Sequence, residues 1–155
     1  MYQERYKEFK KIFDRLCYEY DRYNVFYDFV KLTAISMQNV FIRDAKLEEE
    51  YLNIIGKYNK ETAKLFPELF ATLALMYEER QDICDILGQV YEQEGIANKY
   101  LGQFFTPFHV SKLMTKIAFE DTNTDKIIQE KGYITMSEPT CGAGRNGISC
   151  CKCTL

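Results

Sequence analysis

The segment that decides the fold is TAKLFPELFATLALMY, residues 62–77, which is apolar on nearly every side. A helix of this kind is buried at the centre of a bundle, because no face of it is suited to water. Pro67 lies inside the segment. It either kinks the helix or occupies the first turn of a helix that begins near Phe66, since proline removes one backbone donor. The segment therefore predicts an α-helical bundle with this helix at its centre.

Three stripes of apolar residues at helical spacing precede this segment and predict three more helices. The first stripe, whose opposite face is charged, consists of Tyr2, Tyr6, Phe9, Phe13, Leu16 and Tyr20. The second begins after Asn24 and comprises Phe26, Phe29, Val30, Thr33, Met37, Val40 and Phe41. The third comprises Leu47, Tyr51, Ile54, Ile55 and Tyr58.

One further helix is predicted between Asp82 and Gly95. The Asp82 side chain caps the first amides of this helix, and glycine is a residue on which helices commonly end. The apolar face of the helix consists of Ile83, Ile86, Leu87, Val90 and Tyr91. We therefore expect residues 1–95 to form an N-terminal helical domain.

The composition restricts the function classes that are open to the chain. Its 155 residues hold one domain, or one domain and a fragment of another. A formal net charge of -3 excludes a generally basic nucleic-acid-binding module, so any nucleic-acid contact must be local. The longest uncharged apolar run, residues 69–77, is too short to span a bilayer, and the first residues lack the apolar run of a signal peptide. We therefore expect a cytoplasmic protein with reduced cysteines and no membrane contact.

The pattern changes downstream of the helical domain, where Gly, Pro and Thr cluster. Thr106 and Pro107 form a helix start, since a hydroxyl caps exposed amides and a proline at the first helical position loses no hydrogen bond. The apolar residues of this helix are Val110, Leu113, Met114 and Ile117. Residues 133–138, YITMSE, are the one predicted strand, and Pro139 ends it.

Two short elements of this region could form a ligand site. The strand runs into EPTCGAG, residues 138–144, whose glycines let the backbone approach a ligand closely. Upstream, LGQFFTP, residues 101–107, places two rings and a hydroxyl at a helix N-terminus. Each element has a purely structural alternative, namely a tight turn without a ligand and a capped helix with Phe104 and Phe105 in the core.

The order and spacing of GQFFTP (102–107) and EPTCGAG (138–144) resemble the cofactor motifs of the amino-methylating DNA methyltransferases, especially the modification subunits of type I restriction systems. DILGQVYE (85–92) is similar to the end of the helical domain that precedes the catalytic domain in that family. The resemblance implies a mainly α chain. Its N-terminal helical bundle would be followed, in residues 96–155, by the incomplete start of a class I methyltransferase α/β (Rossmann-like) domain.

The resemblance implies a transferase that moves a methyl group from S-adenosylmethionine to the exocyclic amine of adenine in DNA, after the base is rotated out of the duplex. Phe105, Thr106 and Pro107 would line the methionine end of this cofactor, and Gln103 is a further candidate. The loop beneath the cofactor would comprise Glu138, Pro139, Cys141, Gly142 and Gly144. DNA would be the substrate, and a specificity or restriction subunit would be a partner.

The chain departs from the family at the catalytic step. The family uses an Asn or Asp followed by Pro-Pro and an aromatic residue, whereas Pro67, Pro107 and Pro139 are the only prolines here. A doubly wound sheet also needs several strands, and only one is predicted. We therefore expect a truncated domain with a partial S-adenosylmethionine site, no catalytic residue, and no methyltransferase activity of the isolated chain.

Other chemistries have less specific patterns. The spacing of Cys141, Cys150, Cys151 and Cys153 is unlike the paired ligands of structural zinc sites, so no metal is expected. The first helix also carries a group of cations, which could form a DNA-binding patch or an ordinary solvated face. The nearby carboxylates offset them, which favours the solvated face. The cations are Lys7, Lys10, Lys11, Arg15 and Arg22, and the carboxylates are Glu4, Glu8, Asp14, Glu19 and Asp21. The alternative function is a non-enzymatic helical interaction module, in which the helices dock a partner subunit and the methyltransferase segment is vestigial.

Overall fold

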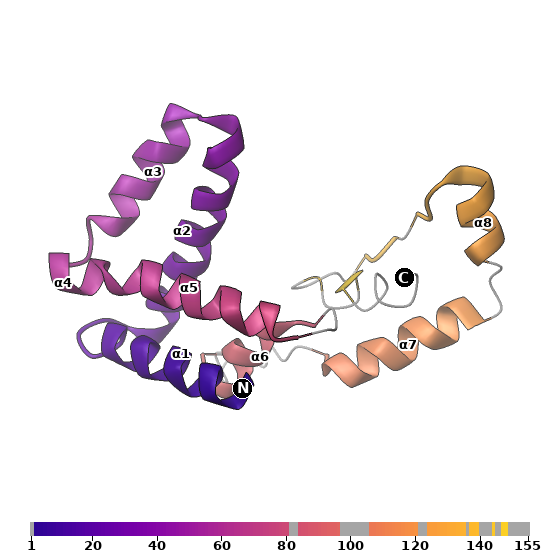
Figure 1. Cartoon of the computed structure of the whole chain (residues 1–155), viewed down its shortest axis with the longest axis horizontal. Helices are drawn as coiled ribbons and strands as arrows, with labels where there is room; N and C mark the ends of the chain where they lie inside the picture. Colours follow the sequence, from indigo (N-terminus) through magenta and orange to yellow (C-terminus); the bar gives the residue numbers. More distant parts are fainter. Residues whose placement is uncertain are drawn as a thin grey trace. The chain divides into compact units, whose positions relative to one another are not determined.

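The computed structural model describes residues 2–80, 84–96, 106–120, 124–135, 137–139, 144 and 147–148. The chain forms two compact units, Met1–Glu79 (the first unit) and Arg80–Leu155 (the second unit). The predicted domain boundary after residue 95 falls inside the second unit and stays a prediction. The described residues are mainly helical and include no strand (Figure 1).

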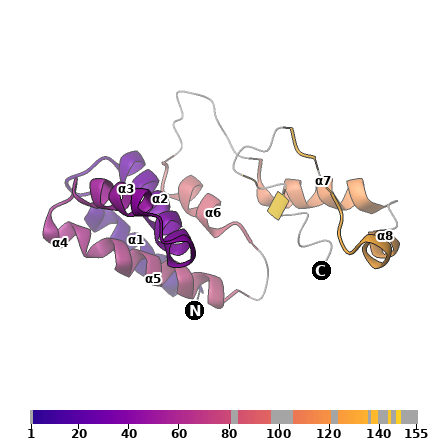
Figure 2. The same cartoon turned by 90° about the horizontal axis from the view of Figure 1, so that it is seen from above.

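The helices described in the first unit are α1 (Tyr2–Leu16), α2 (Arg22–Ile42), α3 (Ala45–Ile55), α4 (Lys60–Ala63) and α5 (Leu65–Glu78). Helix α1 packs along α5, α2 packs against α3, and α4 adjoins α5. Figure 1 shows α2 and α3 as an antiparallel pair, and Figure 2 shows the same helices from above. The predicted helical bundle is therefore confirmed for this unit.

The core of the first unit is built around phenylalanine rings. Phe9 and Phe13 lie one helical turn apart on α1, and both are fully buried. The Phe9 ring meets Phe29 of α2 edge to face, with 6.0 Å between centroids. Leu69 and Met76 of α5 are also fully buried. The apolar spacing of α1 thus serves to bring these rings together, because residues four apart share a helix face.

Helix α5 resolves the two alternatives for Pro67. The helix begins at Leu65, so Pro67 lies in its first turn, where a missing backbone donor breaks no hydrogen bond. Burial on every side, by contrast, was a wrong prediction, because Phe70, Leu75 and Tyr77 are partly exposed. The reason is that α5 packs chiefly on α1 and therefore has one covered side.

Helix α2 also buries a different face from the predicted one. Its buried residues are Val25, Asp28, Phe29, Leu32 and Ile35. Of the predicted stripe, Met37, Val40 and Phe41 are exposed near the C-terminal end. The helix therefore contacts the core from Val25 to Ile35 and presents apolar side chains to solvent in its last turns.

The link between α2 and α3 is fixed by Asn39. Arg43 has a positive φ of 54°, and its backbone N–H donates to the Asn39 carbonyl at 3.1 Å. The backbone N–H of Asp44 donates to the Asn39 side-chain oxygen at 2.7 Å. Asp44 in turn caps α3 by accepting from the Lys46 amide. These bonds hold the left-handed residue that reverses the chain between the two helices.

The helices described in the second unit are α6 (Ile86–Gln93), α7 (Phe108–Glu120) and α8 (Thr124–Lys131). Asp85 caps α6, since its side chain accepts from the Gly88 amide at 2.8 Å, whereas the predicted cap, Asp82, lies outside the described residues. Gly95 ends α6 with a φ of 63°, and the amides of Gly95 and Ile96 donate back to Glu92 and Tyr91. This is the predicted glycine termination.

Two features of the second unit differ from the sequence expectation. Helix α8 was not predicted. Residues 133–135 and 137–138, which belong to the predicted strand, carry no strand pairing in the structure. A strand needs a neighbour with which to exchange backbone hydrogen bonds, and no second strand occurs among the described residues.

Candidate functional site

Some of the residues assigned to the cofactor site are described in the structure. Thr106 and Pro107 are exposed and directly precede α7, whose first amides, from Val110 and Ser111, donate to the Pro107 carbonyl. Glu138 is half-buried and Pro139 is exposed. Four other candidates lie outside the described residues, namely Gln103, Phe105, Cys141 and Gly142. The predicted meeting of the two motifs in one pocket therefore stays a prediction.

Gly144, the last glycine of the predicted loop, has a positive φ of 79°. Its carbonyl accepts a hydrogen bond from the Ile148 amide at 3.0 Å, which closes one helical turn directly after the loop. A residue with a side chain rarely adopts this backbone conformation, so glycine is required here. This bond and the helical residues 147–148 agree with a helix after the predicted loop, whereas residues 140–143 and 145–146 lie outside the described residues, so the loop stays a prediction.

Helix α7 exposes its apolar stripe and buries small polar residues. Val110, Leu113, Met114 and Ile117 have the spacing of one helix face and are all exposed. Ser111 and Thr115 are buried, and the Thr115 hydroxyl donates to the Ser111 carbonyl at 2.9 Å. An exposed stripe of this spacing is the side by which a helix packs against a further layer of structure.

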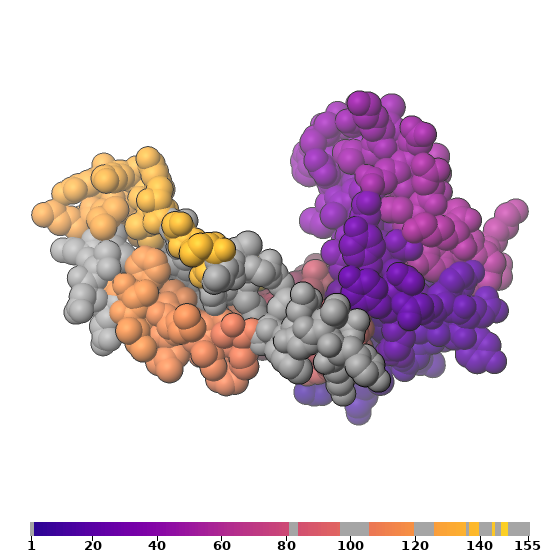
Figure 3. All heavy atoms as spheres, turned by 180° about the vertical axis from the view of Figure 1, so that it is seen from behind, coloured from indigo at the N-terminus to yellow at the C-terminus, as the bar shows by residue number. Residues whose placement is uncertain are grey.

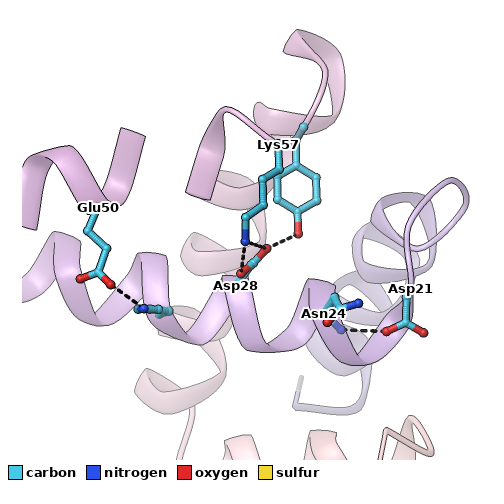
Figure 4. A network of polar contacts seen from close by, with 7 residues as sticks. Asp21, Asn24, Asp28, Glu50 and Lys57 are labelled. Atoms are coloured by element: carbon cyan, nitrogen blue, oxygen red, sulfur yellow. Dashed lines mark hydrogen bonds and ion pairs between the residues drawn. The ribbon is translucent and has the colours of Figure 1, made fainter. Parts of the chain in front are cut away.

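A polar network lies inside the first unit, centred on Asp28 of α2 (Figure 4). The buried Asp28 carboxylate accepts from the Tyr58 hydroxyl at 2.8 Å and from Lys57 Nζ at 3.2 Å. Burial of the phenol, and then its bond to Asp28, raise the pKa of Tyr58 above the ordinary value. The Tyr58 ring also packs on Tyr20 and Phe66, each with 4.7 Å between centroids. The network joins α2 to the segment after α3 and has a structural role.

A groove of about 720 Å³ runs beside α1, and sequence reasoning did not identify it. Its walls come from α1, the turn after α1, and the segment of α4 and α5. The residues that line it are Lys7, Lys10, Lys11, Asp14, Arg15, Tyr18, Glu19, Glu61, Thr62 and Leu65. The surface of the first unit is drawn from indigo to magenta in Figure 3. Lys7, Lys11 and Arg15 recur every four residues, which is the signal that the sequence offered.

Metal and membrane chemistry find no support in the described part of the chain. No cluster of His, Cys, Asp and Glu there could hold a metal ion, and the four cysteines considered for zinc lie outside it. Cys17 and Cys84 form no disulfide bond within the described residues. No described helix is both long enough and apolar enough to cross a bilayer.

Comparison with known proteins gives no assignment. The chain matches no protein-family model, no curated protein and no solved structure.

Proposed function

We propose that this chain is part of a cytoplasmic adenine-specific DNA methyltransferase and carries a partial site for S-adenosylmethionine. The motif resemblance at 102–107 and 138–144 is the basis of the proposal. The structural observation that supports it most is Gly144, which has a positive φ, a conformation that glycine adopts readily, and whose carbonyl accepts a hydrogen bond from the Ile148 amide. The exposed apolar stripe of α7 also fits a helix of an α/β domain, since such helices pack on a sheet.

The roles within the proposed site follow from the chemistry of each group. Thr106 and Pro107 would lie against the methionine end of the cofactor. The Glu138 carboxylate would bind its amino group, because opposite charges pair there. DNA would be the substrate, with a specificity or restriction subunit as partner. The sequence holds no Asn/Asp-Pro-Pro-aromatic element, so we expect a radiolabelled methyl-transfer assay on duplex DNA to show no turnover by this chain alone.

The glycine at position 144 gives a matched test of the cofactor site. We expect Gly144→Ala to weaken S-adenosylmethionine binding about 5- to 30-fold, because an alanine held at this φ costs about 1–2 kcal/mol. Gly132→Ala is the control, since Gly132 has the same φ of 79° and follows α8. A Cβ built on either glycine meets no described atom within 4 Å. The two substitutions therefore impose the same backbone strain at two different positions.

Isothermal titration calorimetry of the two alanine variants and the unchanged chain measures this difference. Binding by the unchanged chain that is weakened by Gly144→Ala and kept by Gly132→Ala supports the proposed site. Equal weakening by both variants would assign the effect to unfolding of the second unit. An unchanged chain that gives no binding heat would refute the proposal.

A helical interaction module is the second candidate, and the exposed end of α2 favours it. Val40 and Phe41 are exposed there together with Met37 and Ile42, and Leu52 of α3 is also exposed. Clusters of exposed apolar side chains commonly mark protein contacts. This reading assigns the first unit to a protein partner and needs no cofactor.

The module reading predicts association through α2. In the purified protein the available partner is a second copy, so we expect sedimentation velocity to show concentration-dependent dimers. The double variant Val40→Ser, Phe41→Ser should remain monomeric with unchanged helix content, because both side chains are already exposed. If the unchanged chain is monomeric at every concentration, the exposed apolar end of α2 would no longer support the module reading.

A further inference from the structure

The groove beside α1 carries a row of cations. Lys7, Lys11 and Arg15 are separated by steps of four residues on α1 and all line the groove. At about 1.5 Å of rise per residue, the row extends for roughly 12 Å along the helix. The positive charges therefore form a line along one wall of the groove.

Two of the three carboxylates of the groove are paired with cations that do not belong to this row. Asp14 pairs with Lys10 at 3.6 Å and with Arg22 at 2.8 Å. Glu61 pairs with Lys64 at 2.8 Å. Glu19 accepts a hydrogen bond from the Asn59 side chain at 3.1 Å, and because this amide is neutral, Glu19 keeps its negative charge in the groove.

By contrast, the side chains of Lys7, Lys11 and Arg15 make no ion pair or hydrogen bond within the described residues. Within the described residues, three cations and one carboxylate of the groove, Glu19, therefore lack an ionic partner, which leaves an excess of positive charge. An anionic ligand would supply the partners that the three cations lack within the described part of the chain.

An aromatic ring stands at the end of the row. Tyr18 follows α1, lines the groove and is 88% exposed. Such an exposed ring offers a face on which a nucleic-acid base can stack. Cations along the backbone path and a stacking ring beside them are the two features by which proteins bind single strands.

We propose that this groove binds single-stranded nucleic acid, with Lys7, Lys11 and Arg15 against successive phosphates and Tyr18 beneath a base. A duplex fits this site poorly, because proteins read duplex DNA by inserting a protruding helix or ribbon into its groove. Here the cationic face of α1 is instead the wall of a concave surface. The proposal uses residues of the first unit only and does not depend on the proposed cofactor site.

Fluorescence anisotropy with a labelled oligodeoxythymidine of about ten nucleotides tests the proposal on the full chain. The groove variant is Lys7→Gln, Lys11→Gln, Arg15→Gln. The control variant is Arg43→Gln, Lys46→Gln, Lys116→Gln, which removes the same charge from exposed side chains outside the groove. We expect the groove variant to bind at least tenfold more weakly and the control variant to bind within about twofold of the unchanged chain.

The salt dependence gives a second readout that a folding defect would not imitate. The slope of log K against log salt should become shallower by about two for the groove variant, since each phosphate contact to a single strand contributes roughly 0.7. Tyr18→Ala should weaken binding about fivefold or more, and Tyr18→Phe should retain it, because the ring supplies the stacking face. Circular dichroism of each variant checks that the helices are intact.

Three results would overturn the proposal. The first is no binding of the oligonucleotide by the unchanged chain. The second is an equal loss of affinity in the groove and control variants, which would assign the effect to net charge. The third is tighter binding of a duplex of the same length, or of polyglutamate, than of the single strand.

Discussion

Phe13→Ala is expected to destabilise the first unit by about 3–5 kcal/mol, the usual cost of truncating a buried phenylalanine. The Phe13 ring is fully buried and lies 6.2 Å from the Phe9 ring and 6.3 Å from the Phe26 ring, measured between centroids. The Arg22 guanidinium lies over the same ring, 4.9 Å from its centroid. Alanine removes these contacts and leaves a cavity, and a loss of this size is a large part of the stability of a small domain.

Urea unfolding followed by far-UV circular dichroism measures this effect. The midpoint should fall by about 1 M or more, because small domains lose about 1–3 kcal/mol per molar urea. Phe41→Ala is the control, since Phe41 is 87% exposed, and it should change the free energy of unfolding by less than about 0.5 kcal/mol. Equal midpoints for the two variants would show that the rings of α1 do not form the core.

Tyr58→Phe is expected to cost the first unit about 1–3 kcal/mol at neutral pH, because it leaves the buried Asp28 carboxylate without its closest donor. The Tyr58 hydroxyl lies 2.8 Å from the carboxylate, closer than the Lys57 ammonium at 3.2 Å. The ring itself remains in the variant, so packing on Tyr20 and Phe66 is retained. The measured loss therefore reports the hydrogen bond.

The same variant is also expected to change the response to alkaline pH. Burial of the phenol, and then its bond to Asp28, place the folded-state pKa of Tyr58 above the unfolded value of about 10. A raised folded-state pKa gives stability that is fully present below the unfolded pKa and is lost as pH rises through the folded pKa. Between pH 10 and 11 the unchanged chain should therefore lose about 1 kcal/mol more than Tyr58→Phe, because half of the unfolded phenol is already ionised at pH 10.

Urea unfolding at the two alkaline pH values tests this difference. Tyr18→Phe is the control, because the Tyr18 ring is exposed, and this variant should keep the pH dependence of the unchanged chain. Parallel pH curves for the unchanged chain and Tyr58→Phe would mean that the fold does not hold this phenol protonated.

Apart from α4 and α8, the described helices could be predicted from the sequence because apolar spacing repeats with the helical period. Which face each helix buries could be predicted less well. The stripe assigned to α2 included Met37 and Phe41, which are exposed, and it omitted Asp28, which is buried. Burial of a carboxylate depends on the donors that reach it, and Tyr58 is 30 residues away in the chain. Periodicity along one helix contains no information on such a distant partner.

The two candidate sites also differ in how far the sequence alone predicts them. The cofactor motifs are local in sequence, so Thr106 and Gly144 could be selected from their neighbours alone. The cationic groove could not be predicted in this way. A sum of charges along α1 lets Asp14 cancel Lys7, although Asp14 pairs with Lys10 and Arg22 in the structure. Only the folded chain shows that Glu61 of α4 lines the same groove and binds Lys64.

The packing of α1 on α5 has a consequence for folding during synthesis. The two helices are joined by an ion pair between Arg5 and Glu79 at 3.2 Å, and these residues are 74 positions apart. Translation at about 5–20 residues per second would leave α1 without α5 for several seconds. Helices α2 and α3 are adjacent in the chain, so this pair can form before α1 packs on α5. The side of α1 that packs on α5 would therefore stay open to chaperones until α5 leaves the ribosome.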